Sequence, residues 1–247
     1  MYPYRIQDPM YLYGHRGAKA EAPENTLAGF EHLRSLGIHR VELDIRLSLD
    51  DELIVLHDHT LDRTTNGSGD IRKHHSNELA ALDARKTHPQ WPKATGVPTL
   101  KQVLANWPEL ESIQLEVKAT KAPMLRIIAH KLHDLIAELE IEEQAIITSA
   151  HKGFLQLSRK LSQAQTSYIA HGFVAERFCR NPLGIIRRLR CQYLCANYKL
   201  LTPKLVKQAH QYEVFVSAWT VNTIEEAEQL ASMHVDSIIT DAPSLFL

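Results

Sequence analysis

The sequence predicts an α/β protein in which residues 1–247 form a single domain, a (β/α)8 barrel of the TIM type. Short β-type runs alternate with helical runs from one end of the chain to the other. Eight main β runs can be counted, and a barrel of eight such units takes roughly 250 residues. Strands that alternate with helices are parallel and are joined by right-handed crossovers. A doubly wound open sheet shows the same alternation and is the alternative.

The first third of the chain contains the clearest individual signals. A short β run at 11–14 ends in glycine and leads into a loop. Thr26 then opens a helical stretch with apolar residues at helical spacing, and Gly37 ends it. Residues 40–47, RVELDIRL, alternate strictly between apolar and polar side chains, as a strand with one polar face does. A further β-type run, LIVLH, follows at 53–57 after a few residues that suit a turn.

The middle of the chain interrupts the alternation, which then resumes up to the C-terminus. Residues 60–98 carry turn sequences and several prolines, so we expect irregular structure there. The later predicted strands are 112–118, 144–149, 167–171, 192–197, 214–221 and 236–241. The predicted helices between them are 99–106, 123–139, 152–163, 182–190, 202–211 and 223–232.

Composition and charge exclude several classes of protein. The chain has 28 Lys and Arg residues against 29 Asp and Glu residues, a net charge of −1. Nucleic-acid binding favours a basic surplus or stripe, so we expect no nucleic-acid partner. The sequence has no run of 18 apolar residues and no basic start followed by an apolar run, so we expect neither a transmembrane segment nor a signal peptide. Three irregularly spaced cysteines, Cys179, Cys191 and Cys195, suit reduced thiols in the cytoplasm.

Polar side chains occur where the predicted barrel strands end, which is the side of such a barrel that carries the chemistry. Glu42 and Asp44 are two residues apart on one strand and therefore share a face, while the opposite face is apolar. Glu116 and Lys118 repeat this spacing on what should be the adjacent strand. The polar residues at all these ends are His15, Arg16, Glu42, Asp44, His57, Asp58, Glu116, Lys118, Trp219, Asn222 and Asp241.

Three carboxylates that point into one barrel require a neutralising charge, because burying several of them together is costly. A divalent cation is one solution, and Glu42, Asp44 and Glu116 offer the hard oxygen ligands that Mg²⁺ or Ca²⁺ prefers over Zn²⁺. The alternative is an ion-pair cluster in which Arg16 and Lys118 neutralise the same carboxylates and only fill a polar core. Residue spacing alone leaves both interpretations open.

Two histidines and two cations at the same strand ends point to phosphoryl chemistry. His15 and His57 could divide general acid and general base work near neutral pH. Arg16 and Lys118 could bind an anionic group, the first with a two-pronged contact and the second as a point charge. The sequence has no G-x-S-x-G motif that would indicate a serine hydrolase.

Four segments carry a resemblance to a known family. GHRGAKAEAPENT (14–26), VELDIRLSLDDELIVLHDHTLDRTTNGSG (41–69), LEVK (115–118) and SAWTVN (217–222) resemble the glycerophosphodiester phosphodiesterase family. The segments come in family order and the resemblance covers the whole chain. It implies a (β/α)8 barrel and hydrolysis of a small-molecule glycerophosphodiester to sn-glycerol 3-phosphate and an alcohol. The short 58–100 segment resembles the compact cytoplasmic members of the family.

The resemblance also assigns the reacting groups. It implies acid–base roles for His15 and His57, and metal ligation by Glu42, Asp44 and Glu116. The metal would be Mg²⁺ or Ca²⁺, with Mn²⁺ a further candidate. The attacking oxygen would belong either to water or to the neighbouring glycerol hydroxyl, which would form a cyclic phosphate.

The remaining assigned positions concern substrate binding. The resemblance implies that Arg16 and Lys118 contact the phosphate, and that Trp219 lines the glycerol side of the pocket. Glu24 and Asn25 match the element that organises the first loop. Two rival functions remain at this stage: phospholipase D-like action on lysophospholipids, and a non-catalytic phosphate-binding barrel.

Two pairs of residues have spacings that are also common among metal ligands, but we do not interpret either pair as a metal site. Cys191 and Cys195 lie four residues apart on a predicted strand, but no histidine at ligand spacing accompanies them, so we expect buried thiols. His59 lies two residues after His57, and we expect it to point outward from a loop.

Overall fold

The computed structural model describes residues 10–118, 121–164, 168–177 and 179–247, and within them eight parallel strands close into a barrel. The barrel strands are β1 (Tyr11–His15), β2 (Arg40–Leu47), β4 (Ser112–Val117), β5 (Ala145–Ser149), β6 (Ala170–Ala175), β7 (Tyr193–Asn197), β8 (Phe215–Trp219) and β9 (Ser237–Thr240). The ring closes because β1 pairs in parallel with both β9 and β2. The predicted single-domain barrel is confirmed, and the open doubly wound sheet is wrong.

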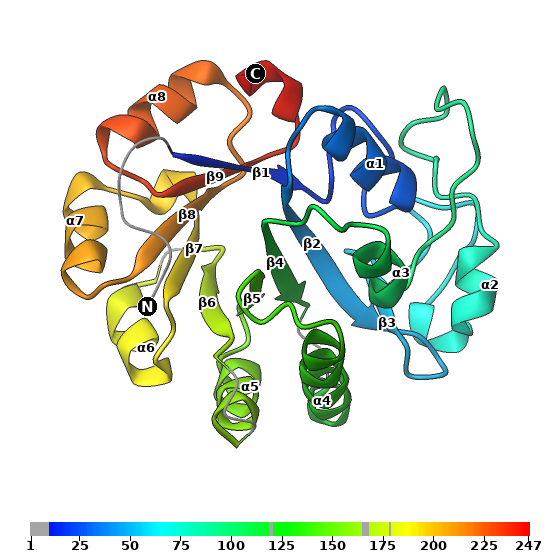
Figure 1. The fold of residues 1–247 in the computed structure, drawn as a ribbon, viewed down its shortest axis with the longest axis horizontal. Helices are drawn as coiled ribbons and strands as arrows, with labels where there is room; N and C mark the ends of the chain where they lie inside the picture. Colours follow the sequence, from blue (N-terminus) through cyan, green and yellow to red (C-terminus); the bar gives the residue numbers. More distant parts are fainter. Residues whose placement is uncertain (1–9, 119–120, 165–167, 178) are drawn as a thin grey trace.

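Helices surround the ring of strands (Figure 1). They are α1 (Leu27–Ser35), α3 (Leu100–Ala105), α4 (Ala122–Glu138), α5 (Lys152–Ala164), α6 (Pro182–Leu189), α7 (Pro203–Gln211) and α8 (Ile224–Ser232). A short helix, α2 (Ser76–Ala80), lies outside this ring in the segment between β3 (Leu53–Val55) and α3. Across the described residues, we find no helix that combines the length and apolar character needed to span a membrane.

Threonine side chains start four of the helices. Thr26, Thr99, Thr202 and Thr223 precede α1, α3, α7 and α8 with extended backbone, and each side-chain oxygen accepts a hydrogen bond from an N–H three residues further on. Such a cap satisfies one of the free N–H groups of the first turn and stabilises a helix by about 1 kcal/mol. The start of α1 directly after Asn25 therefore has a local cause in the sequence.

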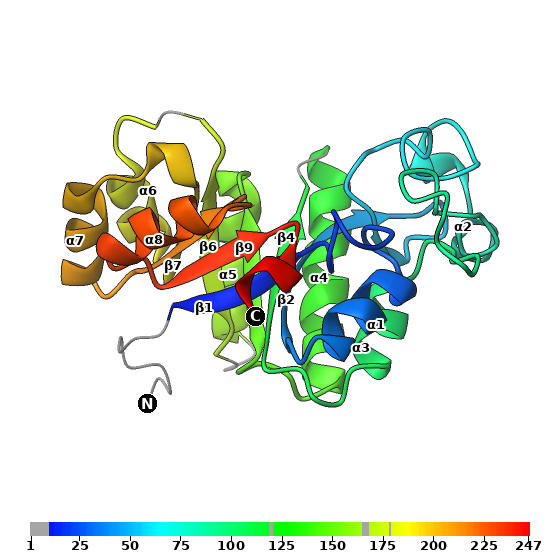
Figure 2. The ribbon, with the colours of Figure 1, turned by 90° about the horizontal axis from the view of Figure 1, so that it is seen from above.

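The segment after β3 has its own small core. β3 pairs antiparallel with β2 and so stands outside the parallel barrel. The structure of 60–98 is largely turns, as predicted, with one short 3-10 helix at Ile71–Lys73 and α2. Its buried apolar residues pack together as Ile54, Leu56, Leu61, Ile71, Leu79, Ala84 and Val97. Figure 2 shows α2 and its loops at one end of the molecule and α7 at the other.

One strand differs in position from its prediction. The sequence suggested 167–171, whereas β6 begins at Ala170 and ends at Ala175; Ser167 lies outside the described residues. Gly172, directly after the predicted strand, lies inside β6, where neighbouring strands leave no room for a side chain. A Cβ at this position would lie 3.0 Å from both the Cys195 sulfur and the Thr148 methyl group. Glycine thus allows β6 to pass close to its neighbouring strands.

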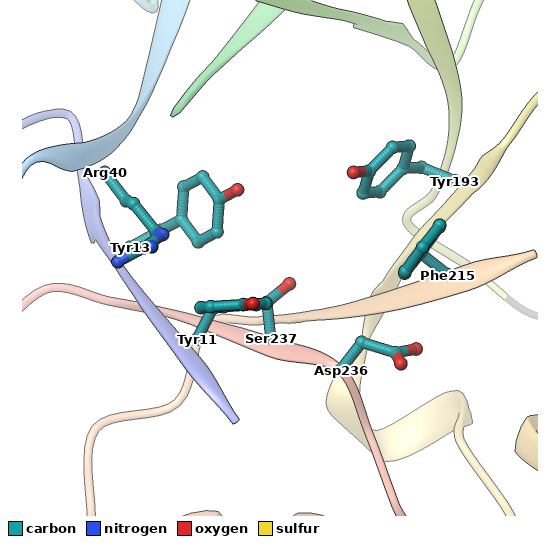
Figure 3. A pocket seen from close by; sticks show the side chains of 7 residues that line it. All are labelled: Tyr11, Tyr13, Arg40, Tyr193, Phe215, Asp236 and Ser237. Carbon is teal, nitrogen blue, oxygen red and sulfur yellow. The ribbon is translucent and has the colours of Figure 1, made fainter. Parts of the chain in front are cut away.

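Aromatic side chains fill the amino-terminal end of the barrel (Figure 3). They leave a cavity of about 20 Å³, room for little more than one water molecule. The Tyr193 and Phe215 rings stack at 5.2 Å, and the Arg40 guanidinium lies 4.5 Å from the centre of the Tyr11 ring. The polar strand ends considered above lie at the opposite, carboxyl-terminal end.

Candidate active site

Three carboxylates meet at the carboxyl ends of β2 and β4. Asp44 on β2 is the direct register partner of Glu116 on β4, and Glu42 lies two residues before Asp44 on the same face. Oxygen atoms of the three side chains all lie within 4.8 Å of one another. The parallel pairing of two neighbouring strands therefore brings together the three acidic residues that the sequence singled out.

Glu42 lacks the neutralising contacts that its two neighbours have. Its side chain is buried, and neither carboxylate oxygen has a hydrogen-bond partner among the described residues. Its one ion-pair contact in the described chain is His15 Nε2 at 3.7 Å. Burial raises the pKa of Glu42 well above its ordinary value, and the charges of Asp44 and Glu116 raise it further. An ion-pair cluster therefore does not account for this carboxylate, whereas a cation between three hard oxygen donors would.

Two cations hold the other carboxylates. Lys118 Nζ lies 3.1 Å from Asp44 Oδ1 and 2.7 Å from Glu116 Oε1, and Arg16 Nε lies 3.1 Å from Asp44 Oδ2. Asn25 adds a hydrogen bond of 2.9 Å to Asp44 Oδ2. Burial alone would raise the pKa of Asp44, but the charges of Lys118 and Arg16 outweigh burial and hold the pKa below its ordinary value. Asp44 therefore stays ionised.

The first loop adopts unusual backbone geometry to present these groups. Arg16 has φ 53° and Asn25 has φ 55°, both in the left-handed region that costs a non-glycine residue of order 1 kcal/mol. The Arg16 N–H donates to the Glu42 carbonyl, and the Asn25 N–H donates to the Arg16 carbonyl. These bonds fix both side chains toward Asp44.

Each predicted acid–base histidine is oriented by a carboxylate. His15 Nδ1 lies 2.5 Å from Asp241 Oδ1, and His57 Nδ1 lies 2.7 Å from Asp58 Oδ1. Because an ionised carboxylate only accepts, Nδ1 carries the hydrogen in both rings and Nε2 is left to react. Burial is the main cause that lowers the pKa of both His15 and His57 below the ordinary 6.5. Asn222 in turn donates to Asp241 Oδ2 at 3.1 Å.

The site contains three residues for which no role was predicted. Asp58 and Asp241 were among the polar residues at the strand ends. Because such residues lie at one rim of a barrel, the sequence could have indicated that they pair with His57 and His15. Arg63 had no such signal, because it lies in the irregular segment after β3. It donates to both Asp58 and Glu24.

The remaining residues considered from the sequence are Trp219, Cys191, Cys195 and His59. Trp219 ends β8, two strands from β1, and its Nε1 makes no hydrogen bond within the described chain. The Cys191 and Cys195 thiols are free and buried, which confirms the structural interpretation. His59 is exposed, as expected.

Comparison with known proteins places this barrel among the phosphoric diester hydrolases. Residues 15–245 match the model of the glycerophosphoryl diester phosphodiesterase family. The chain belongs to that family, and the resemblance stated from its motifs is confirmed.

Relatives match nearly the full length of the chain. A glycerophosphodiester phosphodiesterase from Caldanaerobacter subterraneus subsp. tengcongensis is 30% identical over 96% of this chain and 96% of that protein. One from Bacillus altitudinis is 28% identical over 94% of each. A solved phosphodiesterase from Oleispira antarctica, in complex with the product sn-glycerol-3-phosphate, superposes with a TM-score of 0.85 at 24% identity over 94% of this chain and 93% of that one. This likeness supports the fold.

Proposed function

We propose that this chain hydrolyses glycerophosphodiesters to sn-glycerol 3-phosphate and an alcohol. The observation that carries the proposal is the buried Glu42, whose carboxylate oxygens have no hydrogen-bond partner among the described residues, beside Asp44 and Glu116 and next to two histidines whose Nε2 atoms are left to react. Family membership and the names of the relatives support the substrate class. So does the product bound to the Oleispira antarctica protein.

Glu42, Asp44 and Glu116 would hold a divalent cation, either Mg²⁺, Ca²⁺ or Mn²⁺. Their oxygens suit all three ions. Among the described residues neither Glu42 oxygen has a hydrogen-bond partner, which supports a bound cation rather than an ion-pair core. When bound, the cation would offset the charge of the phosphodiester and the charge that develops during its hydrolysis.

Arg16 and Lys118 would bind the phosphodiester from the protein side. Both already lie against Asp44, at 3.1 Å each, so they are held at the edge of the carboxylate cluster before substrate arrives. Donors fixed in advance stabilise developing negative charge without reorganising during the reaction. Trp219 would form the wall on the glycerol side, where an aromatic face packs against carbon atoms.

His15 and His57 would move the protons. Hydrolysis forms a bond from the attacking oxygen to phosphorus and breaks the bond from phosphorus to the alcohol oxygen. One histidine, neutral with its hydrogen on Nδ1, takes the proton of the attacking oxygen at Nε2. The other, protonated on both nitrogens, gives its Nε2 proton to the departing alcohol. Asp241 and Asp58 accept from Nδ1 in either protonation state and so hold both rings in place.

The proposal extends to the organisation of the chain and its compartment. We assign residues 1–247 to one catalytic domain, which the family match over 15–245 supports. We place the protein in the cytoplasm, and the free thiols of Cys179, Cys191 and Cys195 support a reducing compartment.

The test is release of glycerol 3-phosphate from glycerophosphocholine and glycerophosphoethanolamine, with release of choline from lysophosphatidylcholine and a blank without enzyme measured in parallel. We expect turnover of both glycerophosphodiesters after Mg²⁺, Ca²⁺ or Mn²⁺ is added to EDTA-treated protein. Preferential turnover of the lysophospholipid would replace the proposal with phospholipase D-like action. Binding of glycerol 3-phosphate without turnover of any substrate would indicate a phosphate-binding barrel.

A further inference from the structure

Arg63 lies on a turn that is fixed by packing. Its neighbours Leu61 and Thr64 are 0% and 3% exposed, and Leu61 belongs to the small core beneath the segment after β3. Thr65 donates to the Leu61 carbonyl from both its N–H and its hydroxyl group. The backbone that presents Arg63 is therefore held independently of the active site.

The Arg63 guanidinium joins two loops of the active site. Its Nε donates to Asp58 Oδ2 at 2.6 Å, and its Nη1 and Nη2 donate to the two oxygens of Glu24 at 2.7 and 2.8 Å. Asp58 belongs to the loop that carries His57. Glu24 belongs to the loop that carries Arg16, whose Nη1 donates to Glu24 Oε1 at 2.8 Å. A continuous chain of hydrogen bonds thus runs from His57 to Arg16.

We propose that Arg63 is a positioning residue that couples the acid–base histidine His57 to the phosphate-contacting Arg16. The inference rests on the proposed function, because it takes the roles of His57 and Arg16 from there. Arg63 acts through Asp58 on one side and through Glu24 on the other. The segment after β3 would therefore tie the reacting histidine to the anion-binding loop.

Charge balance explains why the connection matters. Arg63 and Arg16 together neutralise Asp58 and Glu24. Burial favours a higher pKa for Asp58, but hydrogen bonds from Arg63 and His57 outweigh it and hold the pKa at about 2. Burial also opposes ionisation of Glu24, and the hydrogen bonds from Arg63 and the charge of Arg16 outweigh it there too, so its pKa lies below the ordinary value.

Loss of Arg63 would leave one excess negative charge beside a site that must accept an anionic phosphodiester. Among the described residues Arg16 would then be the one cation paired with Glu24, and it would bind substrate less well. Asp58 would lose the partner that fixes its second oxygen, and His57 would lose its defined orientation. Substrate binding and the chemical step should therefore weaken together.

Lysine cannot replace arginine in this position. Arg63 uses three separate nitrogen atoms to reach both oxygens of Glu24 and one oxygen of Asp58. A lysine carries its three hydrogens on one nitrogen and acts as a point charge, so it cannot span both carboxylates in this geometry. Arg63→Lys therefore separates the role of charge from the role of shape.

The experiment measures kcat and KM for glycerophosphocholine in Arg63→Ala and Arg63→Lys, with Arg85→Ala as the matched control. Arg85 lies in the same segment and pairs with Asp83 through two nitrogens, away from the carboxylate cluster. The second readout is Mn²⁺ affinity, measured by isothermal titration calorimetry. Arg63 contacts none of Glu42, Asp44 and Glu116 in the described structure, so a positioning role predicts unchanged Mn²⁺ affinity.

We expect Arg63→Ala to lower kcat/KM about 10- to 100-fold, as loss of a supporting hydrogen-bond partner does, with kcat reduced and KM increased. Arg63→Lys should recover only a small part of this loss. Mn²⁺ affinity and Arg85→Ala kinetics should stay within about twofold of wild type. Combining Arg63→Ala with Asp58→Asn should cost less than the sum of the two single changes.

Full activity of Arg63→Lys would overturn the proposal, because charge alone would then suffice. If Arg63→Ala fails to fold, the kinetics of Arg63→Lys still test the proposal. Wild-type kinetics in folded Arg63→Ala, or equal loss of Mn²⁺ affinity, would overturn it as well. Absence of turnover in the wild-type protein would instead refute the proposed function, and the role of Arg63 with it.

Discussion

Two histidines and a serine form a buried chain between α4, α5 and β6. His133 Nε2 and His171 Nε2 each lie 2.8 Å from the Ser158 hydroxyl, and His171 Nδ1 lies 2.9 Å from the Ile169 carbonyl. All three side chains are fully buried. Because a carbonyl only accepts, Nδ1 of His171 carries the hydrogen and its Nε2 accepts from the serine hydroxyl. Burial lowers the pKa of His171, so the ring is neutral near neutral pH in the folded protein.

This arrangement makes stability depend on pH with a definite sign. Burial, together with the charge of His133, lowers the pKa of His171 to about 3 from the ordinary 6.5. As pH falls through 6.5 the unfolded chain takes up a proton at His171, whereas the folded chain does so only near pH 3. Stability is therefore lost toward acid, by roughly 3 kcal/mol between pH 7.5 and pH 4.5.

The assay is urea unfolding of wild type and His171→Asn from pH 7.5 to 4.5. We expect the variant to be less stable than wild type at pH 7.5. Between pH 7.5 and pH 4.5 wild type should lose roughly 3 kcal/mol more unfolding free energy than the variant. His130→Asn is the control, since His130 is an exposed residue on the same helix as His133. Parallel curves for wild type and His171→Asn would refute the reasoning.

Two further predictions concern His15, a proposed acid–base residue, and the barrel interior. Asp241→Asn should lower kcat about 10- to 100-fold with an unchanged circular dichroism spectrum, because His15 loses the acceptor that sets its tautomer; unchanged steady-state kinetics would contradict this. Gly172→Ala should destabilise the fold by about 1–3 kcal/mol, because its Cβ would lie 3.0 Å from Cys195 and Thr148. Urea unfolding measures that loss, and wild-type stability would show that β6 can shift to accept a methyl group.

The strand-end rule explains why much of the candidate site could be predicted. Parallel strands bring their carboxyl ends to one rim, so Glu42, Asp44 and Glu116 had to meet once the strands were recognised. The strict alternation of residues 40–47 made β2 the easiest strand to recognise, and the two acidic residues came with it.

Contacts between loops could not be predicted in the same way. Arg63 lies 39 residues from Glu24 in the sequence, and no periodicity links the two positions. The continuation of β6 beyond His171 was missed for a related reason, because the need for Gly172 arises from Cys195 and Thr148 on the neighbouring strands. Both features depend on tertiary packing, which local patterns do not encode.

The most direct measurement of the central claim is glycerol 3-phosphate release by wild type and Glu42→Gln after EDTA treatment and titration with Mn²⁺. Glutamine keeps the size of the side chain and removes the charge that has no partner in the cluster. We expect Mn²⁺ to restore wild-type turnover, and Glu42→Gln to stay folded, bind Mn²⁺ more weakly and remain nearly inactive. Turnover that persists without metal, or an active Glu42→Gln, would contradict the account.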